Sequence, residues 1–400
     1  MSEVAIKPKK YAYIDALRGL AASGIIVHHV PRLYLGKPIN AFLSMAAGGL
    51  PVFFMLSALT LFISFHNRKG DDEKRPVLNF FIRRFFRIAP LFYALVLYFL
   101  WYDGFGQRTP NEPDLAVGFG AILANLTFTF GLHPYWISSI VHNGWSIGTE
   151  MLFYVCIPLL YRTVTTLRKS LWFFILSLFF GKVITFILAH FIAPRTAPGP
   201  LATEFWAAFY YQSFFGQLPI FALGILLFFL IKAYEDKTLT DGIDDQPGSR
   251  RTLARPILAL FVLFYINSAL QTFTTDGLVP KFVTDYALLY MPFIFALYLN
   301  PTKVLVNKMT MYLGKISYSL YLTHAVVIFA IEKVIPGHIL GQGMLNYLFF
   351  LAVAFALTVV LATITYHLIE KPGQELGKKL IDKLERRTVG ATELAASVNQ

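Results

Sequence analysis

The sequence predicts an all-α polytopic membrane protein, a bundle of about ten transmembrane helices with both termini in the cytoplasm. Of its 400 residues, 56% are apolar and only 14% are charged, whereas about 25% of the residues in soluble domains are charged. A chain so poor in charge cannot give several soluble cores a hydrated surface. The apolar residues also gather in long runs, and Lys and Arg are concentrated on one predicted side of the membrane.

Apolar runs of about 17 to 25 residues are the length that crosses a bilayer, and a scan for them gives ten predicted spans. These are Tyr13–Leu33, Leu43–Phe65, Ile88–Trp101, Trp145–Tyr161, Leu171–Ile192, Phe214–Ile231, Ile257–Gln271, Phe282–Leu299, Met311–Ile331 and Met344–Ile369. A weaker apolar segment, Leu115–Leu132, contains three glycines and an asparagine. It is predicted to be an interfacial or re-entrant helix.

The distribution of charge predicts the topology. With the N-terminus in the cytoplasm, 28 of the 35 Lys and Arg residues fall inside and six fall outside, as the positive-inside rule requires. The first apolar run follows three lysines and shows no small-residue cleavage site, so we expect it to remain as an anchor. The expected organisation is a cytoplasmic N-terminus (1–12), a transmembrane domain (13–370) and a cytoplasmic tail (371–400).

Several classes of protein and site are excluded by composition and motif. The 39 Phe and 21 Tyr are too many for a disordered or collagenous chain. The single Cys156 forms no intramolecular disulfide and no Cys-rich zinc site, and we predict no metal site. Because the net charge of +12 follows the predicted topology, we expect no nucleic-acid partner. His66 and Asp71 have the spacing of a glycerolipid acyltransferase motif, but they lie in a charged loop, and we discard them.

Ionisable side chains inside predicted spans are the main indication of function, because burying them in a membrane is unfavourable unless they face a bundle interior or a wet cavity. Those within spans are His28, His29, Glu150, Lys182, His190 and His324. Those at the predicted cytoplasmic boundary are Asp15, Arg18, Arg83, Arg84 and Arg87.

His29 is a candidate general base. If the first helix starts near Ile14, His29 lies about 22 Å along it, towards the outer side. A neutral imidazole there has an ordinary pKa near the operating pH, which suits proton abstraction. A core histidine bonded to a neighbouring carbonyl explains the residue equally well.

Arg84 and Arg87 are a candidate phosphate site, because residues three apart share one helix face. Two planar guanidiniums on one face suit a polyphosphate. Arginine clusters at inner helix ends also anchor proteins to lipid headgroups, and from these residues alone that alternative is favoured.

Two further helices carry polar faces. Ser146, Glu150 and Tyr154 follow at intervals of four residues, so they form a polar stripe. Glu150 could hold a sugar hydroxyl, orient an imidazole or neutralise Lys182, whereas Trp145 and Tyr154 could simply belong to the interfacial aromatic belt.

Ser317, Tyr321 and His324 share one face of the ninth predicted helix, and we expect them to line the bundle interior. Glu370 lies at the predicted inner boundary of the last helix. Its role there could be functional or purely structural.

Taken together, these fragments resemble acyltransferase family 3, the multi-span bacterial membrane O-acyltransferases that modify surface glycans and some small molecules. The matching fragments, in chain order, are Asp15 to Gly19 with His29; Val52 to Ser57; Arg84 and Arg87 ahead of Pro90; Trp145 and Ser146 with Glu150, Phe153 and Tyr154; Ser317 to Leu322 with His324; and Glu370 to Pro372. Ala58 departs from the family, which usually has glycine there. The resemblance is to the stand-alone form without a hydrolase-like domain.

The resemblance implies a multi-pass enzyme of the bacterial inner membrane. It would move an acyl group, most often acetyl, from cytoplasmic acyl-CoA to a hydroxyl of a carbohydrate acceptor at the outer face, with acyl-CoA as co-substrate and no bound cofactor. The spacing after Arg18 identifies His29, not His28, as the family's functional histidine. Arg84 and Arg87 correspond to its arginine motif, associated with the donor, and we group Arg18 with them.

The remaining candidates receive roles in the same mechanism. We expect His29 to take the proton of the acceptor hydroxyl, and a transient acyl-histidine is equally allowed. Glu150 would orient the acceptor or the imidazole. Acceptor or oxyanion contacts are assigned to the following residues: Trp145, Tyr154, Lys182, Tyr321 and His324.

Two other classes compete with an enzyme. Buried His, Glu and Lys also form proton relays in secondary transporters and flippases, although no clear pair of inverted repeats is visible here. A purely structural membrane subunit would not need His29 and Arg84 to act together. The sequence leaves open the acceptor, the acyl chain length and the oligomeric state.

Overall fold

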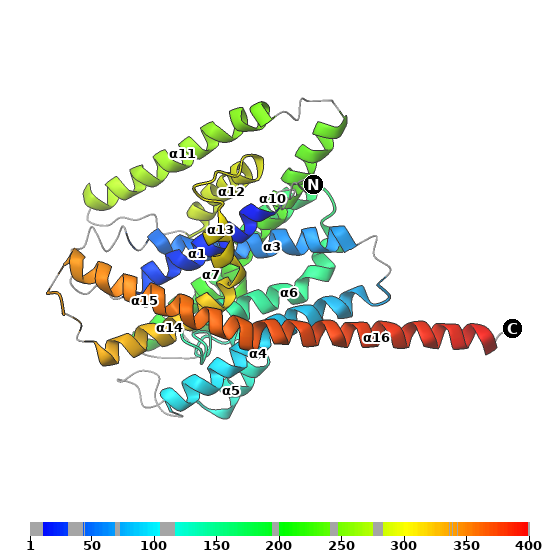
Figure 1. Ribbon diagram of the computed structural model, residues 1–400, viewed down its shortest axis with the longest axis horizontal. Helices are drawn as coiled ribbons and strands as arrows, with labels where there is room; N and C mark the ends of the chain where they lie inside the picture. The colour runs from blue at the N-terminus through cyan, green and yellow to red at the C-terminus, as the bar shows by residue number, and fades with distance from the viewer. Residues whose placement is uncertain are drawn as a thin grey trace, which may run out of the picture. The chain divides into compact units, whose positions relative to one another are not determined.

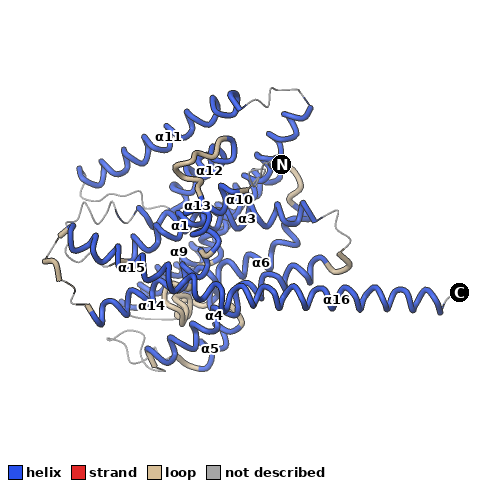
Figure 2. Tube along the Cα trace, in the orientation of Figure 1, coloured by secondary structure: helices blue, strands red, loops and turns tan. Residues whose placement is uncertain are grey.

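The computed structural model describes residues 11–30, 43, 45–68, 73–104, 117–193, 200–240, 247–274, 283–335, 337, 339–341 and 343–398. Within these residues all regular structure is helical, and Figure 2 shows helices joined by loops. A helix lies at each of the ten predicted spans, which confirms the all-α class. The first ten residues, the predicted end of the first span at 31–33 and Asp71 of the discarded motif lie outside the described residues.

Five described helices are long and apolar enough to cross a membrane: Gly49–Asn67, Pro76–Tyr102, Leu167–Ile192, Phe205–Asp236 and Met344–Arg386. The helices Lys308–Lys315 and Ser317–Val334 form a sixth if the pair, bent by 76°, is one span. The protein therefore has the character of a multi-pass membrane protein. The number of ten spans and the cytoplasmic position of both termini stay predictions.

The chain divides into two compact units, and the first comprises residues 1–59 and 220–362. Its α-helices, which are labelled in Figure 1, are α1 (Ala12–His29), most of α3 (Gly49–Asn67), most of α10 (Phe214–Thr240), α11 (Pro247–Thr274), α12 (Val283–Leu299), α13 (Lys308–Lys315), α14 (Ser317–Val334) and most of α15 (Met344–Thr365). The short 3-10 helix η1 (Met45–Gly48) also belongs to this unit. The histidine candidates lie in this unit.

Two glycines allow α1 and α13 to pack closely. A Cβ on Gly314 would overlap the carbonyl oxygen of Asp15, and a Cβ on Gly19 would overlap the carbonyl oxygen of Thr310. Small residues that let backbones approach in this way are typical of helix pairs in membranes. A capping box between Asn307 and Thr310 starts α13, and the chain then bends into α14. The α1–α13 contact thus places α1 beside α14, the helix that carries Tyr321 and His324.

Replacing Gly314 with alanine is expected to destabilise the protein, because the added methyl group must separate α1 from α13. Overpacking of this kind costs about 1–3 kcal/mol, and more where the neighbour is backbone. Thermal unfolding of the purified protein in detergent measures the loss. Gly118→Ala is the control, since a Cβ there meets nothing within 4 Å. Equal melting temperatures for the two variants would contradict the close packing.

The structure also explains how the chain accommodates Ala58. Ala58 is fully buried on α3, and its Cβ lies 2.8 Å from the position that a Cβ would take on Gly224 of α10. The family's usual glycine is therefore replaced on one helix, while the facing helix supplies a glycine. The close approach of α3 and α10 is kept.

The second unit comprises residues 60–219 and 363–400. Its elements are α4 (Pro76–Tyr102), α5 (Phe119–Leu126), η3 (Phe130–Leu132), α6 (Trp145–Thr163), α7 (Leu167–Ile187), η4 (Leu188–Ile192), α9 (Pro200–Gln212), η5 (Tyr366–Glu370) and α16 (Lys371–Val398), together with the ends of α3, α10 and α15. The arginine candidates lie in this unit.

The segment Leu115–Leu132 does not form an eleventh span. The eight residues of α5 are about 12 Å long, less than half the thickness of the bilayer core. The 3-10 helix η3 follows after a short turn. This agrees with an interfacial or re-entrant segment; residues 115 and 116 lie outside the described residues.

The third predicted span, Ile88–Trp101, lies within a longer helix. The helix α4 begins at Pro76, not at Ile88, because the apolar residues before Arg83 continue it towards its N-terminus. Arg84 therefore lies about 12 Å inside a 27-residue helix. The three arginines within five residues indicate the cytoplasmic boundary of the membrane, so the predicted span begins after them.

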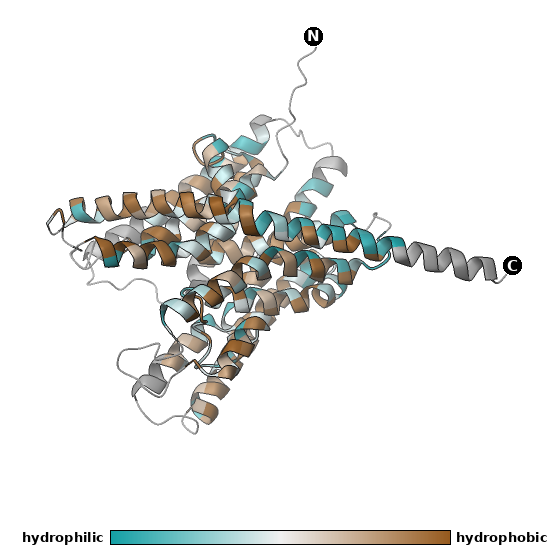
Figure 3. Cartoon of the chain, turned by 60° about the horizontal axis from the view of Figure 1, so that its bottom comes forward, coloured by the Kyte–Doolittle hydropathy of each residue, from teal (hydrophilic) through white to brown (hydrophobic). Residues whose placement is uncertain are grey.

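The C-terminal helix α16 holds the start of α4. Gly373 and Gly377 allow α16 to pack against Phe86 of α4. No side chain within α4 caps its N-terminus, and Glu385 of α16 accepts the backbone N–H groups of Lys74 and Arg75 at 3.0 and 3.2 Å. Figure 3 shows hydrophilic residues along this helix towards the C-terminus. The C-terminal segment thus supports the helix that carries the arginines.

Glu73, just before α4, is expected to make stability depend on pH. Its carboxylate accepts hydrogen bonds from Arg68 at 2.8 Å and from Arg83 at 2.9 Å. Burial opposes the charged form, but the hydrogen bond and charge of Arg83 outweigh it and lower the pKa of Glu73. A pKa lowered by folding stabilises the protein above the unfolded value of about 4.3, and this stabilisation is lost as the pH falls through the folded pKa.

Glu73→Gln is therefore expected to lower the melting temperature at neutral pH, with the difference from wild type shrinking in acid. Melting curves of the purified protein over a pH series measure it. Glu375→Gln is the control, because Glu375 makes only an exposed contact with Lys371 at 3.9 Å. A melting-temperature loss of the same size at every pH would show that the charge of Glu73 is not involved.

Candidate active site

Three imidazoles come together in the first unit. The rings of His28 and His29, at the end of α1, have centroids 4.9 Å apart, and the ring of His29 lies 5.0 Å from that of His324 on α14. His324 is fully buried, and His29 is half-buried. Tyr347 of α15 donates a hydrogen bond of 3.0 Å to the carbonyl oxygen of Val27, which holds the end of α1. We call His28, His29, His324 and Tyr321 the histidine cluster.

Hydrogen bonds to the backbone determine which nitrogen of each ring carries the proton. The Nδ1 of His29 lies 3.0 Å from the carbonyl oxygen of Ile25, and the Nδ1 of His324 contacts the carbonyl oxygen of Tyr321. A carbonyl only accepts, so each Nδ1 must be the donor. In the neutral ring the Nε2 is then the nitrogen that can take up a proton. His190, exposed on η4, has the same bond to Phe186, so what distinguishes His29 is its neighbour His324.

The predicted interior face of α14 is confirmed. Ser317, Tyr321 and His324 are all buried. The Tyr321 ring lies 5.8 Å from that of His324 and 6.2 Å from that of Phe53 on α3. The helical period therefore placed these side chains correctly. The contact between His324 and His29 shows that α1 contributes to the same cluster.

The second unit contains the arginine cluster, which we define as Phe80, Arg84, Arg87, Glu150 and Tyr154. The guanidinium of Arg84 lies 5.7 Å from the ring centre of Phe80 and 5.7 Å from that of Tyr154, so it has cation–π contacts with both rings. Tyr154 donates its hydroxyl to Glu150 at 2.5 Å. This hydrogen bond confirms that Glu150 and Tyr154 lie on one face of α6.

The arginine cluster contains several charged groups and one buried hydrogen-bond donor that has no acceptor among the residues that the structure describes. Arg87 and Glu150 both lie within electrostatic range of Arg84. The Nε–H of Arg84 is buried and has no hydrogen-bond partner among the described residues. A buried charged donor without an acceptor is unfavourable, so this position suits an anionic ligand that supplies one.

The sequence placed Glu150 within the fourth span, near its outer start, and Arg84 at the cytoplasmic boundary, whereas the structure places both in one cluster. They meet where α4 packs against α6, through the ring and hydroxyl of Tyr154. Sequence reasoning also missed Phe80. Its position four residues before Arg84 on the same helix is the signal that could have found it.

The other candidates occupy separate places. Arg18 is half-buried on α1, directly before Gly19, which contacts α13. The Trp145 ring, at the start of α6, lies 5.5 Å from that of Tyr211. Lys182 is exposed on α7. Within the described parts of the chain, no three His, Cys, Asp or Glu side chains are arranged to hold a metal ion.

Comparison with known proteins shows the family. The family model described as an acyltransferase domain matches residues 11–367, and the chain belongs to that family. A Staphylococcus aureus (strain COL) protein provisionally named an O-acetyltransferase is 25% identical over 94% of this chain. The chain spans only 60% of the length of that relative.

Two further relatives are closer in length. A protein of Acidianus two-tailed virus, provisionally named an acetyltransferase, is 26% identical over 86% of this chain and 88% of its own. An acyltransferase of Streptomyces mycarofaciens is 24% identical over 84% of this chain and 81% of its own. No solved structure matches the chain.

Proposed function

We propose that the chain is a membrane O-acyltransferase that uses acyl-CoA, with acetyl-CoA as its usual donor, and a carbohydrate hydroxyl as acceptor. Family membership supports acyl transfer, and the names of the relatives favour oxygen as the accepting atom. The observation that supports the mechanism most directly is the histidine cluster. In a neutral His29 ring whose Nδ1–H is donated to Ile25, the Nε2 is the nitrogen that can accept a proton, and a second, buried imidazole lies beside it.

The arginine cluster is proposed to bind the phosphates of the donor. Arg84 and Arg87 supply two positive charges on one helix face, and the buried Nε–H of Arg84 is a donor that a phosphate oxygen can satisfy. Glu150 and Tyr154 are positioning residues in this proposal, because Tyr154 packs on the guanidinium and bonds to Glu150. Arg18, on α1, is grouped with these arginines from the sequence, as a further positive charge for the phosphates of the donor.

In the proposed reaction the acceptor oxygen attacks the thioester carbon while the Nε2 of His29 takes the hydroxyl proton. The new C–O bond forms, the C–S bond breaks, and the CoA sulfur leaves with the proton returned by His29. The hydroxyl of Tyr321 is proposed to stabilise the negative oxygen of the intermediate. A neutral His324 cannot do so, because its Nδ1–H is donated to the carbonyl oxygen of Tyr321 and its Nε2 then carries no hydrogen. Trp145 and Lys182 are assigned to acceptor binding, since an aromatic ring and an exposed ammonium both contact sugars.

The proposed location is the bacterial inner membrane, with the donor entering from the cytoplasm and the acceptor from the outer side. The charge bias of the loops supports this orientation. Mass spectrometry of the cell-surface glycans of a deletion strain tests the function. Acyl groups should disappear on deletion and return with the wild-type gene. Unchanged acylation of all surface glycans, together with accumulation of an untransported precursor, would favour a transporter.

A further inference from the structure

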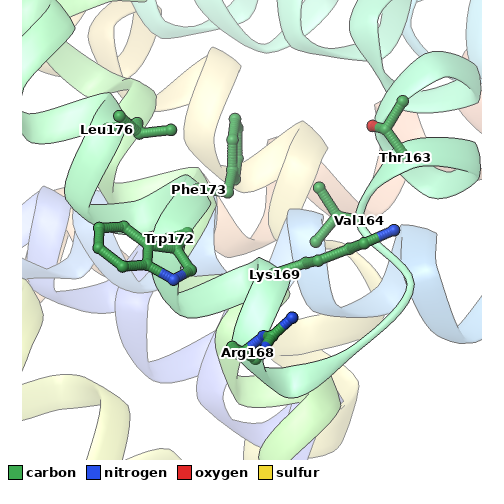
Figure 4. A pocket seen from close by; sticks show the side chains of 7 residues that line it. All are labelled: Thr163, Val164, Arg168, Lys169, Trp172, Phe173 and Leu176. Carbon is green, nitrogen blue, oxygen red and sulfur yellow. The ribbon is translucent and has the colours of Figure 1, made fainter.

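A pocket of about 330 Å³ that is largely open to the surface, called the cavity below, lies beside the corner between α6 and α7 in the second unit, and it shares no residue with the arginine cluster. Figure 4 shows its seven lining side chains, with Thr163 and Val164 on one side and Trp172, Phe173 and Leu176 on the other. The two basic residues, Arg168 and Lys169, complete the lining. The proposed mechanism uses none of these residues.

The electrostatics of the cavity favour a negatively charged group. Arg168 and Lys169 line it, and none of the seven lining residues is acidic. Both belong to the first turn of α7, a 21-residue helix whose N-terminus carries a partial positive charge. Thr166 caps this end by accepting the backbone N–H of Lys169 at 3.2 Å. The cavity therefore combines two full positive charges with the positive end of a helix.

The other wall of the cavity is apolar and continues into an exposed apolar surface of α7. Trp172 and Leu176 are more than half exposed, and Phe179 is 68% exposed one turn further along α7. Only 17% of the apolar window of α7 is buried inside the protein, although the helix is long and apolar enough to cross a membrane. A soluble anion would use the basic residues but leave this apolar wall unused.

We propose that this cavity binds the phosphate headgroup of an anionic glycerophospholipid. Arg168 and Lys169 contact the phosphate, and the acyl chains lie along Trp172 and Leu176 on the exposed face of α7. Basic pockets at the cytoplasmic ends of membrane helices bind such headgroups in other proteins, and the charge bias predicts this end of α7 to be cytoplasmic. The site is additional to the proposed acyl-transfer sites, because the proposed mechanism assigns no role to its lining residues.

Native mass spectrometry of the purified full-length chain in detergent tests the proposal. The protein is titrated with phosphatidylglycerol and with phosphatidylcholine of the same acyl chains. Wild type should bind phosphatidylglycerol more tightly. Removing both charges, in the variant Arg168→Ala with Lys169→Ala, should weaken phosphatidylglycerol binding about 30-fold, with little change for phosphatidylcholine. The control is Lys378→Ala with Lys379→Ala, which removes the same charge from exposed positions on α16.

A second variant tests the cavity itself. Thr163→Trp keeps both basic residues but fills the space, so it should also reduce phosphatidylglycerol binding, and it decides the question if the double variant does not fold. Unchanged binding in Thr163→Trp, or an equal loss in the control on α16, would overturn the site. Displacement of phosphatidylglycerol by CoA or inorganic phosphate at similar concentrations would show a soluble-phosphate site and overturn the lipid assignment.

Discussion

Replacing His29 with alanine is expected to lower the rate of acyl transfer by about 10²–10⁴-fold, the usual contribution of a general base. The variant loses the Nε2 atom that is proposed to accept the hydroxyl proton, but it keeps Arg84 and its neighbours in the other unit. Donor affinity should therefore be nearly unchanged. Transfer of radiolabelled acetyl groups from acetyl-CoA in membranes containing equal amounts of each protein measures the rate.

His190→Ala is the matched control for this experiment. His190 donates its Nδ1–H to the carbonyl four residues earlier, as His29 does, but it is exposed on η4 and stacks on Phe186 at 4.2 Å. The His190→Ala variant should transfer acyl groups at the wild-type rate. Full activity of His29→Ala would remove the proposed base, whereas acyl groups trapped on the wild-type His29 side chain would favour an acyl-histidine over direct transfer.

Replacing Arg84 with alanine is expected to raise the KM for acyl-CoA by about 10- to 100-fold, because a hydrogen bond to a charged group contributes about 1.5–3 kcal/mol. The kcat at saturating donor and the KM for the acceptor should change much less. The same membrane assay, run over a range of acetyl-CoA concentrations, separates these constants.

Two variants of the same cluster sharpen the test. Arg84→Lys keeps the positive charge but loses the planar group that lies by the rings of Phe80 and Tyr154, so an intermediate KM is expected. Tyr154→Phe keeps the ring and removes the hydroxyl that bonds to Glu150. It should raise the donor KM only modestly. A KM for acyl-CoA that is unchanged in Arg84→Ala would contradict the phosphate-binding role.

The arrangement within single helices was predictable from the sequence. Glu150 and Tyr154 are four residues apart and are hydrogen-bonded, and Tyr321 and His324 are three apart and are both buried. The helical period alone brings such pairs together. The length and apolar composition of the chain likewise predicted an all-α membrane protein. Apolar runs of this length cross a membrane as helices, because a helix satisfies the hydrogen bonds of its own backbone.

Contacts between helices were decided by the tertiary structure. His29 meets His324 because α1 and α13 approach through Gly19 and Gly314, and Arg84 meets Tyr154 because α4 packs against α6. The spacing of residues along a sequence does not encode how closely two helix backbones approach. Between α1 and α13 the close approach depends on both Gly19 and Gly314, because a side chain at either position would overlap the other helix. The sequence by itself thus determined which residues share a helix face, and the packing decided which faces meet.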